Sequence, residues 1–176
     1  MRTIILLLSL ALIPSGVLAE SAAGVQWTAP AGWATRGPAP MRAATYTIPP
    51  APGDPAGGEC GVYFFGAGQG GTAEANIERW INQVKQPDGS PSKDKAKIDT
   101  LTVNGLHVTT LDLLGNYSGG MSQDSAPHDS KAIYRLRGAI IDTPKGSYFA
   151  KLTGPEKTVA HWDQAFNDYI HSFEFK

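Results

Sequence analysis

The stretch from Cys60 to Val84 joins a short apolar strand, a glycine-rich turn and an amphipathic helix. We expect the strand over Cys60–Phe65. In the helical part, apolar residues recur at three- and four-residue spacing, which predicts one buried helix face. These apolar residues are Ala73, Ile77, Trp80, Ile81 and Val84. Thr72 is the expected N-cap, because its hydroxyl can accept from a first-turn backbone N–H. Trp80 is most simply a core anchor.

The turn contains a G-x-G-x-x-G pattern at Gly66, Gly68 and Gly71. A dinucleotide-binding fold needs a parallel β-α-β unit around such glycines, with an acidic residue about twenty positions later. Here the helix is followed by a polar loop and a hairpin, and no lysine completes a P-loop. We therefore expect a structural turn with at least one positive φ angle, and no nucleotide or other cofactor.

Two hairpins dominate the second half of the chain. Asn104-Gly105 joins Ile98–Val103 to Leu106–Leu114, and this dipeptide suits a type I′ turn. A second hairpin is expected from Ala132–Ile141 and Ser147–Leu152. With earlier strands at 25–29, 43–48 and 60–65, the order is β-β-β-α-β-β-β-β-α. Sequential hairpins predict an α+β fold, a mostly antiparallel sheet of about seven strands with two main helices packed on it.

The second main helix is expected from about Pro155 to Phe173. Thr153 and Glu156 fit a capping box at its start. An apolar stripe along it should be buried against the sheet. The stripe comprises Val159, Trp162, Phe166, Tyr169, Ile170 and Phe173.

The N-terminus is typical of a secretory signal peptide. Arg2 precedes the apolar run Ile4–Ile13, and Val17-Leu18-Ala19 supplies small residues for cleavage after Ala19. We expect residues 1–19 to be removed, leaving one domain, 20–176, that is periplasmic or extracellular and has no stable membrane anchor. The formal net charge of −1 gives no sign of a nucleic-acid partner. Cys60 is the single cysteine and reads as a small buried hydrophobe.

Three motifs resemble those of a group of uncharacterised bacterial secreted proteins. They are W-x-x-P-x-G-W at Trp27–Trp33, M-R at Met41-Arg42, and a pattern like G-G-x-x-x-N-[IV]-x-R-W-x-x-Q, which Gly70-Gly71 and Asn76–Gln83 follow with one extra residue between the glycines and the asparagine. The strand order is similar to the PsbP-like fold, which the Ran-binding Mog proteins share. The secreted group implies no reaction. PsbP and Mog proteins act by binding partners, which is an analogy of fold only.

Candidate binding residues fall in two places. Arg135 and Arg137 alternate with apolar residues, so they share one sheet face, and Lys151 lies on the strand expected to pair with theirs. Arg42 and Arg79 could add to this basic patch. Asp124, His128 and Asp129 lie in the polar segment 116–131. These residues are a possible partner-binding surface or, alternatively, an ordinary solvated face.

Two functions remain open at this point. The first is an exported, non-enzymatic binding or accessory domain with an unknown protein or small-molecule partner. The second is a secreted hydrolase with a spatially assembled site. The sequence offers no G-x-S-x-G elbow, no Cys–His signature and no His or Cys pair at metal-binding spacing. We therefore assign no catalytic or metal-binding residue, and favour the first function.

Overall fold

The computed structural model describes residues 19–37, 39–118 and 132–176. Its main sheet has eight strands in the order β3-β4-β5-β10-β9-β8-β6, with β7 also paired to β8. These strands are β3 Ala34–Thr35, β4 Arg42–Ile48, β5 Gly58–Phe64, β6 Val84–Lys85, β7 Lys97–Val103, β8 Leu106–Tyr117, β9 Tyr134–Thr143 and β10 Gly146–Pro155. All strand pairs of this sheet in the described residues are antiparallel, which confirms the predicted fold class.

A small three-stranded sheet joins the two ends of the described chain. It consists of β1 Ala19–Ala22, β2 Val25–Thr28 and β11 Glu174–Phe175, in the order β1-β2-β11. The helices are α1 Ala73–Ile81, α2 Glu156–His161 and α3 Asp163–His171, with one 3₁₀ turn at Ser92–Lys95. Among the described residues, no helix is long and apolar enough to cross a membrane.

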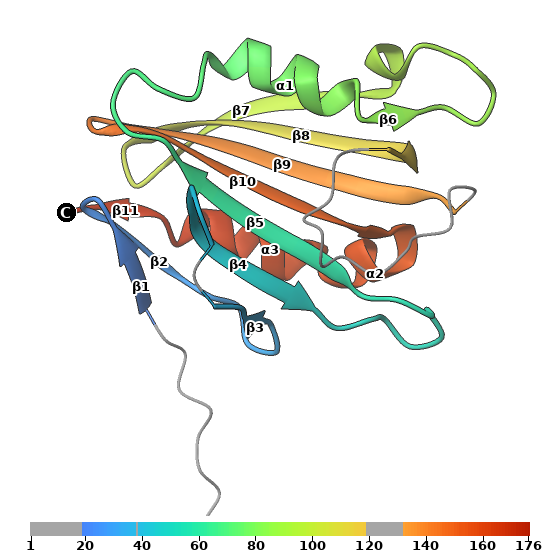
Figure 1. The fold of residues 1–176 in the computed structure, drawn as a ribbon, viewed down its shortest axis with the longest axis horizontal. Helices are drawn as coiled ribbons and strands as arrows, with labels where there is room; N and C mark the ends of the chain where they lie inside the picture. The colour runs from blue at the N-terminus through green and yellow to red at the C-terminus, as the bar shows by residue number, and fades with distance from the viewer. Residues whose placement is uncertain (1–18, 38, 119–131) are drawn as a thin grey trace, which may run out of the picture.

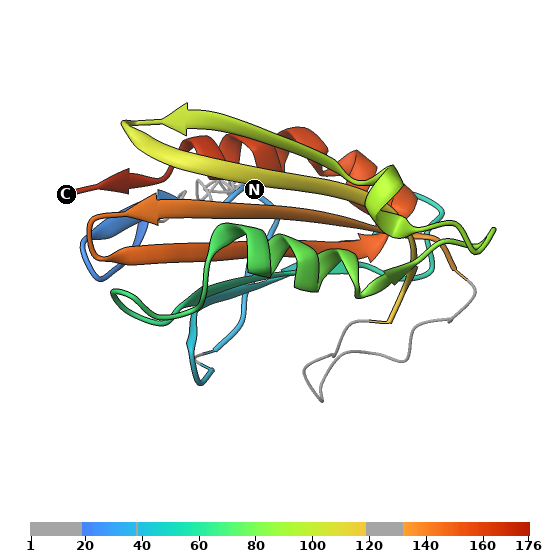
Figure 2. The same cartoon turned by 90° about the horizontal axis from the view of Figure 1, so that it is seen from above.

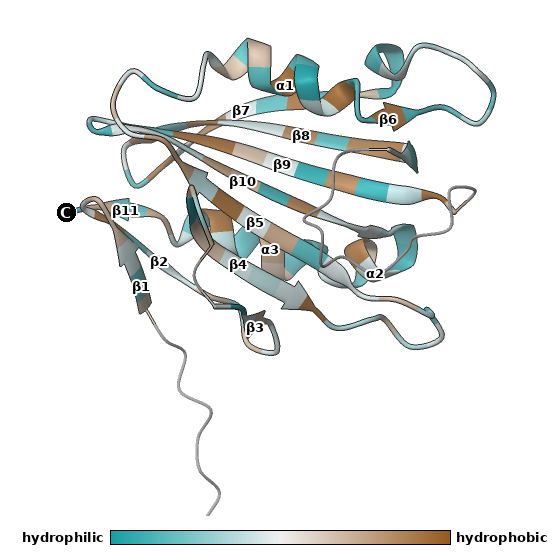
Figure 3. Cartoon of the chain, viewed as in Figure 1, coloured by the Kyte–Doolittle hydropathy of each residue, from teal (hydrophilic) through white to brown (hydrophobic). Residues whose placement is uncertain are grey.

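The helices lie on opposite faces of the main sheet, with α1 on one face and α2 and α3 on the other (Figure 2). We call these the α1 face and the α3 face. The hydrophobic part of β9 (Figure 3) contributes Ala139 and Ile141 to one core and Leu136 and Ile140 to the other, so this strand sends side chains to both layers. Each face therefore has its own core.

The α3 face carries the larger, aromatic core. The Trp27 Nε1 donates to the Tyr46 hydroxyl at 2.8 Å, and the Trp27 ring stacks on Phe173 with centroids 5.3 Å apart. Trp33 packs on Tyr46 and on Tyr169. The two tryptophans of the W-x-x-P-x-G-W motif are thus core residues, respectively 1% and 7% exposed.

The α1 face carries the smaller core, in which Trp80 packs with Leu111, Leu113 and Leu136. The Trp80 ring is 4% exposed, which confirms its predicted role as a core anchor. The predicted N-cap is also confirmed, because the Thr72 hydroxyl accepts from the Ala75 amide at 3.2 Å.

The glycine turn has the positive φ angles that the sequence predicts. Gly66, Gly68, Gly70 and Gly71 all have φ between 69° and 95°. A Cβ on Gly70 would lie 2.8 Å from the rings of Phe65 and Phe149, whereas one on Gly68 would meet open space. The structural part of the prediction is confirmed, and the absence of nucleotide binding stays a prediction.

The predicted type I′ hairpin turn is confirmed, with φ of 49° at Asn104 and 81° at Gly105. The Asn104 side chain has a further structural role. Its Nδ2 donates to the His171 carbonyl at 3.1 Å and to the Phe173 carbonyl at 2.9 Å. The turn therefore also fixes the end of α3.

The predicted continuous helix from Pro155 to Phe173 is wrong in two respects. Thr153 does not cap it, because β10 continues to Pro155 and Thr153 pairs with both neighbouring strands. The helix is also interrupted at Trp162, which separates α2 from α3. The Trp162 ring is only partly buried, and its Nε1 donates to the Pro49 carbonyl at 2.9 Å. A tertiary contact thus fixes a side chain that the periodicity placed in the core stripe.

Candidate functional site

Lys151 lies on the α1 face, with a glycine beside it on each neighbouring strand. It pairs with Gly61 of β5 and with Gly138 of β9. A Cβ on Gly138 would lie 2.4 Å from the Trp80 ring, and one on Gly61 would lie 3.0 Å from the Tyr63 ring. Because neither glycine has a side chain, the Tyr63 and Trp80 rings pack directly against the sheet, one on each side of Lys151. Lys151 therefore lies between these two rings on the α1 face of the sheet.

The Lys151 ammonium is held by two oxygen atoms from different elements. Its Nζ donates to the Gln83 Oε1 and to the Tyr117 hydroxyl, both at 3.1 Å. The same nitrogen lies 5.7 Å from the centre of the Tyr117 ring. Gln83 follows α1, and Tyr117 ends β8, so the end of the helix and the edge of the sheet meet at the lysine.

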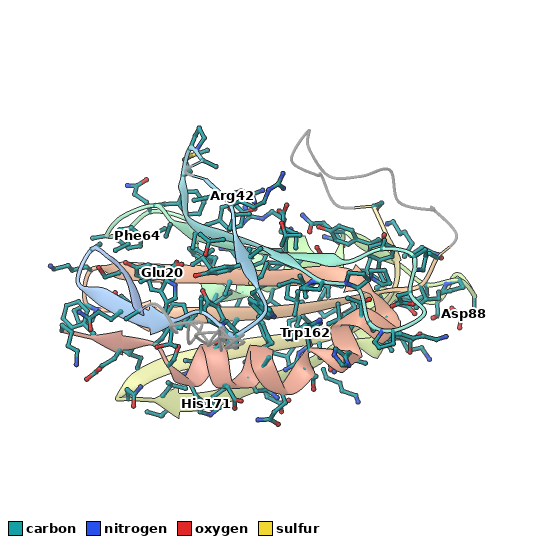
Figure 4. All side chains as sticks on the ribbon, turned by 90° about the horizontal axis from the view of Figure 1, so that it is seen from below. Glu20, Arg42, Phe64, Asp88, Trp162 and His171 are labelled. Carbon is teal, nitrogen blue, oxygen red and sulfur yellow. The ribbon has the colours of Figure 1, made fainter. Side chains whose placement is uncertain are left out.

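Two arginines and one carboxylate complete the surroundings. Arg42 donates to Glu59 at 2.8 Å, and its guanidinium lies 5.1 Å from the centre of the Tyr63 ring. Arg36 reaches the other Glu59 oxygen at 3.2 Å. Arg79, on the exposed side of α1, donates to the Asn76 side-chain oxygen. Figure 4 shows Arg42 on the side of the sheet opposite His171 of α3.

The pKa of Lys151 is lowered to about 8, mainly by burial and also by Arg42 and Arg79, while Glu59 acts in the opposite direction. Burial also raises the pKa of Tyr117 to about 12, so this hydroxyl keeps its proton at neutral pH. A bound anion would offset the mutual repulsion of the three cations.

We define the Lys151 site as Lys151, Arg42, Arg79, Gln83, Tyr63, Tyr117 and Glu59. The arrangement combines cationic donors, two aromatic walls and a protonated hydroxyl on a rigid sheet. Such a set can bind an anion, because charge-assisted hydrogen bonds to carboxylate or phosphate are the strong ones.

The sequence-predicted surface is divided between the two faces. Arg135 and Arg137 share a face as predicted, but Arg137 pairs with Leu152 and not with Lys151. Because neighbouring residues on a strand point to opposite faces, the two arginines lie on the α3 face and Lys151 lies on the α1 face. Arg42 and Arg79 join Lys151 and not the other two arginines.

On the α3 face the arginines are already paired. Arg135 makes two hydrogen bonds to Asp112, at 2.8 and 2.7 Å, and lies 3.3 Å from Asp163. Arg137 pairs with Asp163, donates to the Asn167 side chain at 2.9 Å, and lies over the Phe166 ring. These contacts tie α3 to the sheet and leave little positive charge for a partner.

An open groove of about 420 Å³ lies beside this ion-pair network. Lys95, Lys97, Arg135, Asp112 and Glu156 contribute to its walls. Because three basic and two acidic side chains line the groove, its charge excess is smaller than that of the Lys151 site.

The remaining predicted residues, Asp124, His128 and Asp129, lie outside the described residues. Within the described ranges, no group of three or more His, Cys, Asp or Glu side chains could hold a metal ion.

One exposed cluster brings a serine, a histidine and an acid together. The His107 Nδ1 lies 3.3 Å from one oxygen of Asp142, and the Ser147 hydroxyl donates to the other at 2.7 Å. The carboxylate therefore lies between serine and histidine, whereas a nucleophile relay needs the histidine in the middle. Burial raises the pKa of the Cys60 thiol, which is fully buried, so it is no nucleophile either.

Comparison with known proteins identifies the fold and no more. No protein-family model matches the chain, and no curated protein matches it. Its structure is similar to that of the cyanobacterial PsbP protein from Synechocystis sp. PCC 6803, with TM-score 0.51 and 12% identity over 94% of this chain and 98% of that one. The protein therefore has a PsbP-like α+β fold.

Two other solved structures are more distant. A Pseudomonas aeruginosa protein of unknown function has TM-score 0.48 and 13% identity over 89% of this chain and 94% of that one. A Bacteroides thetaiotaomicron protein has TM-score 0.45 and 11% identity, over 88% of this chain and 46% of that one.

Sequence reasoning missed Glu59, Tyr63 and Tyr117 as site residues. They come from strands far apart in the chain, and only the strand order β5-β10-β9-β8 brings them around one lysine. One signal was present, because Arg42, Arg79 and Gln83 all belong to the motifs that resemble the secreted group. The two glycines beside Lys151 carried no signal without the register.

Proposed function

We propose that this chain is an exported binding or accessory domain, without catalysis of its own, that holds an anionic group of its ligand at the Lys151 site. One observation carries the proposal: Gln83 and Tyr117 fix the Lys151 ammonium on the α1 face, where Arg42 and Arg79 lower its pKa and Glu59 opposes them. Folding brings like charges together at a cost in free energy, and an anion bound between them recovers it.

The motif residues support this assignment. Arg42 from the M-R motif, together with Arg79 and Gln83 from the last motif, gathers around Lys151, while the tryptophans of the first motif form the other core. On this basis we also propose kinship with the uncharacterised bacterial secreted proteins. On this proposal the first motif is structural, and the M-R motif and the last motif contribute residues to binding.

Export is the second part of the proposal, and it rests on the N-terminal sequence. Cleavage after Ala19 would keep Glu20, whose carboxylate accepts from the Tyr46 hydroxyl at 2.6 Å. N-terminal sequencing of the protein recovered from outside the cytoplasm checks it. A recovered chain that still begins with the apolar run Ile4–Ile13 would refute it.

The hydrolase alternative gains no support from the described residues. It requires a nucleophile, a base and an orienting acid around one pocket. The cluster of Ser147, Asp142 and His107 has the wrong order, and Cys60 is buried.

The proposed binding is tested by titrating the purified chain with succinate and with inorganic phosphate, observed by amide NMR. We expect saturable shifts at Gly61, Gly138 and Lys151 for at least one anion, with chloride as the reference. Lys151→Met and Arg42→Met should each weaken binding at least tenfold.

The control is Lys157→Met, which removes an exposed lysine from α2 on the other face. It should leave the affinity unchanged. Shifts that do not saturate, or equal affinity in the Lys151→Met chain, would refute the proposal.

A further inference from the structure

Lys151 differs from an ordinary surface lysine in how its amine is held. The nitrogen is fixed at 3.1 Å from both the Gln83 side-chain oxygen and the Tyr117 hydroxyl, so it does not sweep through solvent. Arg42 and Arg79 act on it electrostatically, and the glycines on both neighbouring strands let the Trp80 and Tyr63 rings lie against the sheet beside it. An amine in such a place can react as well as bind.

We propose that Lys151 captures an aldehyde or a 2-oxo acid as a reversible imine, with the carboxylate of that ligand held by Arg42 and Arg79. The inference rests on the proposed function and specifies its ligand class. It adds a covalent bond to anion recognition, and no turnover is implied.

The step balances without any further reactant. The neutral amine of Lys151 attacks the carbonyl carbon, and a proton moves from nitrogen to the former carbonyl oxygen to give a carbinolamine. Loss of water then leaves a carbon–nitrogen double bond, and nothing is oxidised or reduced. The carbonyl oxygen departs as water, so hydrolysis reverses the step.

Each neighbour has a part in that step. The Tyr117 hydroxyl lies 3.1 Å from the nitrogen and keeps its proton, so it can donate to the departing hydroxyl group. The Gln83 oxygen accepts a hydrogen from the amine and orients its lone pair. The guanidinium groups bind carboxylate in two-pronged fashion, which would fix the carbonyl carbon near the nitrogen.

Protonation favours the same residue. Because burial lowers the pKa of Lys151 to about 8, its neutral fraction at pH 7 exceeds that of an ordinary lysine by a few hundredfold. Exposed lysines such as Lys157 serve as internal references within the same chain.

The test is reductive trapping of the purified wild-type chain with glyoxylate and sodium cyanoborohydride at pH 7. Peptide mass spectrometry then locates each added carboxymethyl group. We expect modification of Lys151 to be at least tenfold greater than that of Lys157. Equal modification of the two lysines would overturn the inference, and this readout needs no variant to fold.

Two further arms separate reactivity from recognition. With acetaldehyde, which has no carboxylate, the preference for Lys151 should fall several-fold, and Arg42→Met should cause a similar loss with glyoxylate. An undiminished preference in both arms would overturn the role of the arginines. Lys151→Met should abolish the selective product.

The outcomes also separate this inference from the proposed function. Succinate binding at the Lys151 site without glyoxylate trapping there would refute imine formation and leave anion binding intact. Loss of both would refute both.

Discussion

The two faces of the main sheet use arginine and lysine in opposite ways. On the α3 face, Asp112 and Asp163 pair with Arg135 and Arg137, and the side chains lock α3 onto the sheet. On the α1 face, Arg42 pairs with Glu59, and both Arg42 and Arg79 also lower the pKa of Lys151, which has no carboxylate partner of its own among the described residues. Figure 1 shows α1 along the β8 side of this face.

The difference separates structural charge from charge available to a ligand. An arginine whose guanidinium is fully paired makes its hydrogen bonds within the fold. Replacing that arginine leaves the partner carboxylate unpaired. A lysine held among other cations destabilises its own charged form. The same residue type can therefore mark a packing contact on one face and a binding site on the other.

The largest effect is expected where the α3 face is most tightly packed. Phe166 is 1% exposed and supports the Arg137 guanidinium, so Phe166→Ala should lower the free energy of unfolding by about 3–5 kcal/mol. Urea denaturation measures this. A loss below about 1 kcal/mol would show that α3 does not depend on this core, and the contrast between the faces would disappear.

The ion pairs themselves come next. Asp163→Ala should cost about 2–3 kcal/mol, less than a fully buried pair because its side chain is a third exposed. The matched control is Asp168→Ala, an exposed acid on the same helix, which should change stability by about 0.5 kcal/mol or less. Equal losses in the two variants would mean that the network contributes nothing specific.

A smaller effect is expected from displacing the Trp80 ring that lies beside Lys151. In Gly138→Ala the new Cβ would overlap the Trp80 ring, so the ring must move, at a cost of about 1–3 kcal/mol. Succinate binding should weaken with it. Gly37→Ala is the control, because a Cβ there meets open space and φ is not positive. If Gly138→Ala is destabilised but binds succinate unchanged, Trp80 does not contribute to anion binding at the Lys151 site.

The smallest effect on stability is expected at Lys151. Lys151→Met keeps the length of the side chain and removes a charge that burial disfavours, so stability at pH 7 should stay within about 1 kcal/mol of wild type. A loss as large as that of Asp163→Ala would show that Lys151 is structural.

The pH dependence of stability has a definite sign. The folded pKa of Lys151 is about 8 and lies below its unfolded value of about 10.4, so the unfolded chain binds more protons between these pH values. This residue therefore makes the free energy of unfolding rise with pH through that window. The raised pKa values of Cys60 and the buried tyrosines make the free energy of unfolding fall with pH, but this effect is the same in wild type and in Lys151→Met. The rise should appear in the difference between wild type and Lys151→Met, and a flat difference would refute the lowered pKa.

About half of the candidate site could be predicted from the sequence. The strand carrying Lys151, the helix carrying Arg79 and the basic character of a surface all followed from local patterns. Which basic residues share a face did not follow. Arg135 and Arg137 were grouped with Lys151 because their strands pair, but a shift of one residue in register exchanges the two faces of a strand.

The sequence by itself determined the features that a few neighbouring residues control. Asn104-Gly105 set the hairpin turn, Thr72 capped α1, and the glycines from 66 to 71 adopted positive φ, because each depends on local backbone sterics and hydrogen bonds. Only the tertiary structure decided the break at Trp162, the pairing of β11 with β2, and which residues lie around Lys151. These depend on contacts between residues far apart in the chain, whose energies no local pattern encodes.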